Sequence, residues 1–116
     1  MTVIIEHQIT AAKIVFCYGA KTYHKYIRKT FGVDEYIDQG GVCTAWHYKD
    51  EFSIVIGVKK IKDEHQLKGM IMHELSHAVT QLFEEYGFKC DELRSYTLQY
   101  LYHEFMPSLD KKRSKR

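Results

Sequence analysis

Residues 73–77 read His-Glu-Leu-Ser-His, and this spacing can bind a metal ion. If the segment is helical, His73 and His77 lie one above the other on one face, so their imidazoles converge on one ion. Glu74 is poorly placed to ligate the same ion, but it can take a proton from a water molecule as a general base. The pattern therefore predicts a zinc site with His73 and His77 as metal ligands and Glu74 as a catalytic residue.

A catalytic zinc ion normally takes three protein ligands and keeps a fourth position for water, so a third ligand is expected. The candidates downstream are Cys90, Asp91, Glu92 and His103. We favour Glu92, because it begins the next predicted helix, and an antiparallel helix after the short 86–90 connection would bring its first turn beside the histidines. Cys90 would suggest a structural site, and Asp91 fits better as a carboxylate that orients a ligand histidine.

Short runs rich in β-branched and aromatic residues predict the strands that precede this cluster. The runs are residues 3–8, 12–18, 42–48 and 52–58, and the polar segment 49–51 is suited to a hairpin between the last two. Between the second and third runs, the spacing predicts a helix from Ala20 that ends at Gly32. We expect the run 52–58 to be an edge strand, which either pairs with an extended substrate backbone or simply closes the sheet.

Two helices follow the hairpin, and the first carries the cluster. Asp63 and Gln66 form a capping-box pattern at its start, apolar residues follow at helical spacing, and Gly87 ends it. The second helix is predicted to begin near Asp91 and to end before Pro107. The order of elements predicts an α+β fold with a small, mostly antiparallel sheet and three helices, in a single domain over residues 1–109.

Charge and composition limit the function further. The chain has 116 residues, 45% of them hydrophobic, and a net charge of +2. Residues 110–116 hold five basic groups and one acid, so the remaining body is close to −2. We therefore expect no nucleic-acid partner for the folded body. Only the basic tail, residues 110–116, has the charge to touch phosphate or anionic lipid, and we expect it to be disordered and solvated.

Cysteine usage and hydropathy bear on the compartment. The three cysteines, Cys17, Cys43 and Cys90, include no C-x-x-C spacing, and an odd number is not the disulfide framework of a small secreted domain. The apolar runs are far shorter than the roughly 18 residues of a membrane span, and the first residues lack the features of a signal peptide. We expect a cytoplasmic protein with no membrane partner, in which Cys43 and Cys90 act as small hydrophobic residues.

The segments around the cluster resemble a known family. Residues 70–79 and 90–101 are similar to the small zinc metallopeptidases encoded by tailed bacteriophages and prophages. Those proteins look like minimal gluzincins of the thermolysin-type clan, in which a helix reading E-x-x-x-Y-x-x-x-Y-L follows the HExxH helix. The resemblance covers about residues 41–101. It implies zinc ligands His73, His77 and Glu92, a general base at Glu74, and action in the host cytoplasm.

The expected function is that of a zinc-dependent metallopeptidase, which hydrolyses a peptide or protein substrate with a zinc-activated water and Glu74 as general base. Tyr96 shares a helical face with Glu92 and is a candidate catalytic donor to the oxyanion; the alternative is a buried tyrosine with an ordinary partner. A second class of function also fits, a non-catalytic phage-type binding or inhibitor protein that keeps a zinc-stabilised scaffold. Replacing Glu74 with Gln separates the two classes, because only the enzyme needs the base.

Overall fold

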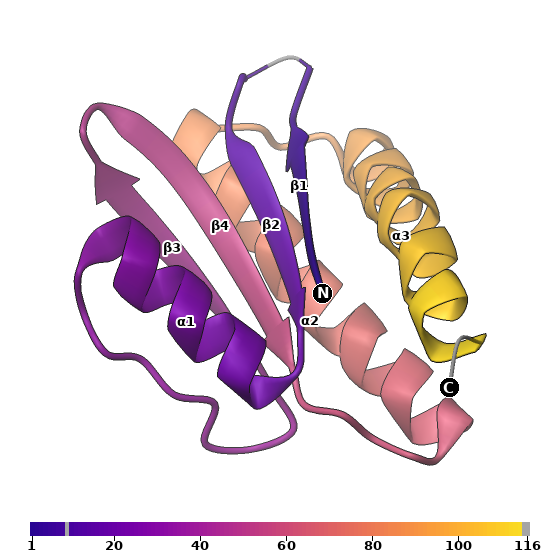
Figure 1. Ribbon diagram of the computed structural model, residues 1–116. Helices are drawn as coiled ribbons and strands as arrows, with labels where there is room; N and C mark the ends of the chain where they lie inside the picture. The colour runs from indigo at the N-terminus through magenta and orange to yellow at the C-terminus, as the bar shows by residue number, and fades with distance from the viewer. Residues whose placement is uncertain (9, 115–116) are drawn as a thin grey trace.

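The computed structural model describes residues 1–8 and 10–114, which form four strands and three helices (Figure 1). In chain order the elements are β1 (Thr2–Glu6), β2 (Lys13–Tyr18), α1 (Ala20–Phe31), β3 (Gly41–Tyr48), β4 (Glu51–Val58), α2 (Glu64–Tyr86) and α3 (Asp91–Ser114). The predicted α+β class is confirmed, and the four strands begin and end within two residues of the predicted runs.

The strands form one mixed sheet in the order β1-β2-β4-β3. β1 pairs with β2 and β3 pairs with β4 in antiparallel fashion, whereas β2 and β4 are parallel. Two of the three pairings are antiparallel, as expected. The prediction that residues 52–58 form an edge strand is wrong, because β4 lies between β2 and β3. The edge next to α2 is β3 instead.

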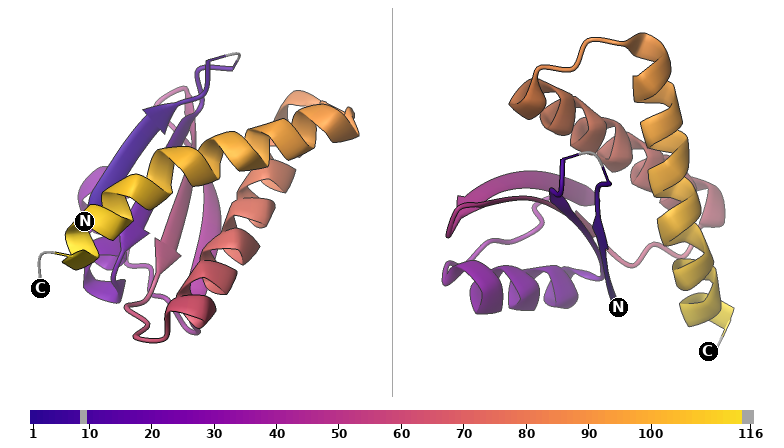
Figure 2. Two further views of the ribbon diagram at one scale, coloured as in Figure 1. Left: turned by 90° about the vertical axis from the view of Figure 1, so that its right-hand side faces the viewer. Right: turned by 90° about the horizontal axis from the view of Figure 1, so that it is seen from above.

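Helices cover both faces of this sheet, which explains why the central strands are almost wholly buried (Figure 2). α1 packs on one face over Val15, Cys17 and Val55. α2 and α3 pack on the other face, where Ile14, Phe16 and further apolar residues of β2 and β4 meet their buried side chains. Strands covered on both faces have near-continuous apolar runs, as residues 52–58 do. The fold thus has three layers, with α2 held between β3 and α3.

Local signals set the ends of α1 and α2 as predicted. The side chain of Asp63 accepts a hydrogen bond from the backbone N–H of Gln66 at 2.9 Å, which caps the first turn of α2. Gly32 and Gly87 end α1 and α2 in the left-handed conformation, with φ of 76° and 71°. This conformation costs glycine little, since it has no Cβ.

The C-terminal helix differs from the prediction, because α3 continues through Pro107 to Ser114. A proline inside a helix removes one backbone hydrogen bond, but here the residues around it are anchored in the core. Phe105, Met106 and Leu109 are all buried, and Arg113 donates a hydrogen bond to the carbonyl of Lys62. The tail predicted to be disordered from residue 110 is therefore helical as far as Ser114. Its last two residues, 115–116, lie outside the described part of the chain.

Among the described residues, none of the helices has the length and apolar character needed to cross a bilayer.

Candidate metal centre

The central turns of α2 hold His73 and His77 side by side. Their Nε2 atoms lie 3.2 Å apart, and the ring planes are nearly perpendicular, at 84°. Both residues are exposed, while Glu74 between them is buried. One nitrogen from each histidine and one carboxylate oxygen all lie within 4.8 Å of one another. The structure therefore brings together three of the residues that the sequence assigned to the site.

The separation of the two nitrogens can be compared with that in a zinc site. Zinc–nitrogen bonds of about 2.0–2.1 Å at a tetrahedral angle place two ligand nitrogens about 3.3 Å apart. The 3.2 Å separation of the Nε2 atoms fits this value. The same distance also fits a hydrogen bond between two neutral imidazoles, so the geometry alone is compatible with either arrangement. The residue types and their spacing suit a zinc ion, and a measurement of metal content decides between the two.

Glu74 is the buried member of the cluster, with only 5% of its surface exposed. Burial raises the pKa of its carboxyl above the ordinary value, and the nearby His73 and His77 oppose that shift. The burial depends on Gly41 at the start of β3. A Cβ placed on Gly41 would lie 2.9 Å from Glu74 Cγ and 3.0 Å from both Glu74 Oε2 and Met70 Sδ. Only a residue without a side chain lets β3 approach Glu74 this closely.

The cluster lines a hollow of about 370 Å³ between the beginning of β3 and the exposed side of α2. Its other walls are residues 39–43, Met70 and Gln81. Cys43 Sγ donates a hydrogen bond of 3.3 Å to Gln81 Oε1, and burial together with the charge of Glu74 raises the pKa of the thiol. Sequence reasoning treated Cys43 as a small hydrophobic residue and missed Gln81. The consecutive glycines 40 and 41 were the available signal, since glycine in a strand often marks a close backbone approach.

Glu92 is not brought to the cluster. It is exposed and is not part of the group of ligand atoms described above. The first turn of α3 does pack against α2, but through Arg94, which donates hydrogen bonds to Thr80 Oγ1 and to the carbonyl of Ser76. Two positions correspond to about 200° of rotation around a helix, so a helix that turns Arg94 toward α2 turns Glu92 away from it. The assignment of Glu92 as third ligand stays a prediction. It requires the first turn of α3 to rotate about the helix axis.

The other candidate ligands also lie elsewhere. Cys90 and Asp91 line a separate hollow of about 440 Å³ at the connection between α2 and α3, together with Arg94 but without His73 or His77.

Tyr96 does not line the hollow of the histidines. Its side chain is 62% exposed and lines a third hollow with His7, Thr97 and Tyr100. The predicted role of Tyr96 as an oxyanion donor therefore has no support from its position, and neither does the alternative of a buried tyrosine.

In comparisons with known proteins, no family model, curated protein or solved structure matches the chain. The resemblance to phage zinc peptidases therefore stands on the quoted motifs alone.

Proposed function

We propose that the protein is a zinc-dependent metallopeptidase whose active site is the hollow around His73, Glu74 and His77. The observation that carries the proposal is the pair of Nε2 atoms 3.2 Å apart, directly beside a buried carboxylate. Two neutral imidazoles suit a divalent transition-metal ion, and Glu74 lies against the same site. The sequence suggests Glu92 as third ligand, but Glu92 lies away from this group in the structure, so the proposal rests on His73 and His77 as the metal ligands.

His73 and His77 have a different chemical role from Glu74 in this proposal. His73 and His77 would hold the zinc ion, which would act as a Lewis acid that polarises a carbonyl and makes water more acidic. Glu74 takes the proton of the attacking water and passes it to the leaving amine. Burial raises the pKa of Glu74 toward the working pH, which favours proton transfer in both directions. His73 and His77 serve as metal donors.

The position of β3 supports a peptide as substrate. β3 is an edge strand of the described sheet, and its first residues line the hollow beside Glu74. An edge strand offers unpaired N–H and C=O groups to an extended chain. A substrate that pairs with β3 would pass directly over the cluster. A hollow of about 370 Å³ lies at the lower end of the roughly 300–1,000 Å³ of ligand pockets, so we expect it to hold only a short stretch of the substrate.

We place this activity in a reducing compartment, the cytoplasm of the cell or of the host if the gene is of phage origin. The three cysteines are free, and Cys43 lies in the proposed active site with a neutral thiol. An oxidising compartment would expose the unpaired thiol of Cys90 to disulfide exchange.

Metal content tests the centre directly. Tag-free protein reconstituted with zinc and dialysed is expected to hold about one ion per chain by elemental analysis. His73→Ala and His77→Ala should each weaken zinc binding by more than about 100-fold, since even residues that only orient metal ligands contribute 10- to 100-fold. His65→Ala is the matched control, because His65 is exposed on the same helix, outside the cluster. Parent protein that holds no zinc contradicts the proposal.

Glu74→Gln separates catalysis from metal binding. The variant should bind zinc like the parent protein and lose at least about 100-fold in the rate of peptide hydrolysis, the usual contribution of a general base. If the parent protein holds zinc but the two proteins have equal biological effect, the non-catalytic binding or inhibitor function replaces the peptidase.

A further inference from the structure

α1 has an unusual distribution of charge. Its twelve residues include four basic side chains and no acid, so the helix alone carries +4, twice the net charge of the whole chain. Three of the four are Lys21, Lys25 and Lys29, which follow one another at four-residue spacing. Like charges at this spacing repel each other and destabilise the helix. A run of them along one face needs a reason other than helix stability.

The three lysines lie on the solvent side of α1, opposite its buried face. The buried residues each lie two positions further along the helix: Tyr23, Ile27 and Phe31. Two positions are about 200° of rotation, which turns the lysines directly outward. All three are exposed, and among the described residues no acidic side chain forms an ion pair with Lys21, Lys25 or Lys29. They are spaced about 6 Å apart along the helix axis.

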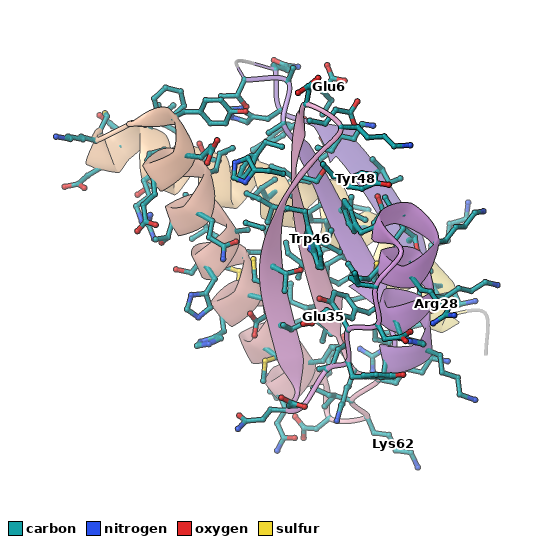
Figure 3. The ribbon with its side chains drawn as sticks, turned by 90° about the vertical axis from the view of Figure 1, so that its left-hand side faces the viewer. Glu6, Arg28, Glu35, Trp46, Tyr48 and Lys62 are labelled. Atoms are coloured by element: carbon teal, nitrogen blue, oxygen red, sulfur yellow. The ribbon has the colours of Figure 1, made fainter. Side chains whose placement is uncertain are left out.

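The positive surface continues beyond the start of α1. The side chain of Lys60 lies next to Gly19, with its Cε 3.5 Å from the position that a Cβ of Gly19 would take. Burial and the nearby charges of Lys112 and Lys60 lower the pKa of the Met1 amino group. Figure 3 shows Arg28 on α1 and Lys62 before α2 pointing into solvent. Lys60, from the connection between β4 and α2, thus extends the positive surface at the start of α1.

An exposed aromatic ring lies beside the second turn of α1. Tyr36 is 64% exposed and stacks on His24 with ring centroids 4.3 Å apart. Asp34 links the loop before Tyr36 to the middle of α1, because its Oδ1 accepts hydrogen bonds from His24 Nε2 at 2.8 Å and from Arg28 Nη1 at 2.6 Å. One face of the tyrosine ring is covered by His24, so a flat ligand can stack on the ring only from outside.

We infer that the outer face of α1, with Lys21, Lys25 and Lys29, binds single-stranded nucleic acid together with the neighbouring Tyr36. The local charge of α1 thus replaces the expectation, drawn from the net charge of the folded body, that this body has no nucleic-acid partner. Lysines in a row neutralise successive phosphates, and an exposed aromatic ring gives a base a surface on which to stack. A membrane fits this face less well. Helices that bind the bilayer surface insert apolar side chains beside their basic ones, and none of the large exposed hydrophobic residues belongs to α1.

The test measures binding of a fluorescein-labelled 20-nucleotide oligothymidylate by anisotropy at 50 and 200 mM salt. The triple variant Lys21→Gln, Lys25→Gln, Lys29→Gln is expected to bind at least tenfold more weakly at 50 mM salt. The slope of log affinity against log salt should fall by about 2, because each phosphate contact contributes about 0.7 for a single strand.

A second triple variant, Lys49→Gln, Lys68→Gln, Lys89→Gln, is the matched control. These lysines are also exposed and the change in net charge is the same, but Lys68 lies on α2, and Lys49 and Lys89 lie in the β3–β4 and α2–α3 connections. Its affinity should stay within about threefold of the parent. Circular dichroism checks that both variants keep the helical content of the parent.

Tyr36→Ala tests the stacking contact and should weaken binding by at least about fivefold. Equal losses in the two lysine variants would overturn the inference, and so would a parent protein that does not bind the oligonucleotide at 50 mM salt. If the protein sediments with phosphatidylcholine vesicles containing 30% phosphatidylserine but does not bind the oligonucleotide, the outer face of α1 is a membrane-binding surface instead. An unchanged affinity of Tyr36→Ala would refute the contact with bases.

Discussion

Gly41→Ala is the substitution that most directly tests how the fold shapes the candidate active site. The added Cβ would lie 2.9 Å from Glu74 Cγ and 3.0 Å from Met70 Sδ, whereas ordinary contacts begin at 3.4 Å. Both neighbours belong to side chains of α2, so they must shift by about half an ångström, or β3 must move away from the helix. Either response displaces the carboxylate of Glu74.

The size of the effect follows from this displacement. Overpacking a close contact costs about 1–3 kcal/mol of stability. A misplacement of about 1 Å in a catalytic group can cost about 100-fold in rate, so half of that distance should cost about tenfold in kcat/KM. Zinc binding should be unchanged, because no atom of His73 or His77 is among the close neighbours of the new Cβ.

Gly69→Ala provides the matched control on the active helix itself. A Cβ on Gly69 meets no atom within 4 Å, so this substitution should stabilise α2 by about 0.5–1 kcal/mol. Urea denaturation measures both stabilities without any substrate, and hydrolysis of an unfolded protein at saturating zinc measures kcat/KM. A Gly41→Ala variant as stable and as active as the parent would refute the close packing of Gly41 on Glu74.

Three further predictions use other parts of the molecule. Glu92→Ala should have a zinc affinity within about threefold of that of the parent, as measured by competition with a chelator. A loss of affinity as large as that of His77→Ala would show that α3 rotates and brings Glu92 to the metal ion. Burial lowers the pKa of His7 below 6.5, so the folded protein should lose stability as the pH falls below that value. The His7→Gln variant should lose less stability between pH 7.5 and pH 5.5, as measured by urea denaturation at the two pH values. Gly57→Ala should cost about 1–3 kcal/mol in the same assay, because its Cβ would meet the ring of Tyr23 at 2.5 Å; unchanged stability would contradict that packing.

Local signals were sufficient to predict the elements of the fold but not their arrangement. Caps and periodicity involve neighbours within one turn of helix or one strand, and Asp63 and Gly87 work as the sequence suggested. The parallel pairing of β2 with β4 joins segments about forty residues apart, and no local pattern encodes it. The near-continuous apolar run of residues 52–58 was the available sign of a central strand, and residues 53–58 are all buried. Pro107 shows tertiary packing overriding a local rule, since buried neighbours keep α3 intact.

The candidate site likewise has one part that follows from local sequence and another part that depends on tertiary packing. His73, Glu74 and His77 belong to one helical turn, so their proximity follows from the sequence spacing. Glu92 depends on how α3 is rotated about its own axis, and the hydrogen bonds of Arg94 set that rotation in the structure. The wall formed by residues 39–43 depends on where the edge of the sheet meets α2. Predicting that wall requires the order of the strands, which the sequence did not supply.

The two proposals concern opposite sides of the sheet. The group of His73, Glu74 and His77 lies on α2, while the row of lysines lies on α1, on the other face of the sheet (Figures 1 and 2). A nucleic-acid strand along α1 therefore leaves the hollow beside β3 free for a peptide. Glu74→Gln should bind oligonucleotide like the parent, and the triple lysine variant of α1 should hold zinc like the parent. Because each variant leaves the other function intact, either proposal can fail alone, and a protein that passes both tests would be a peptidase able to act while bound to nucleic acid.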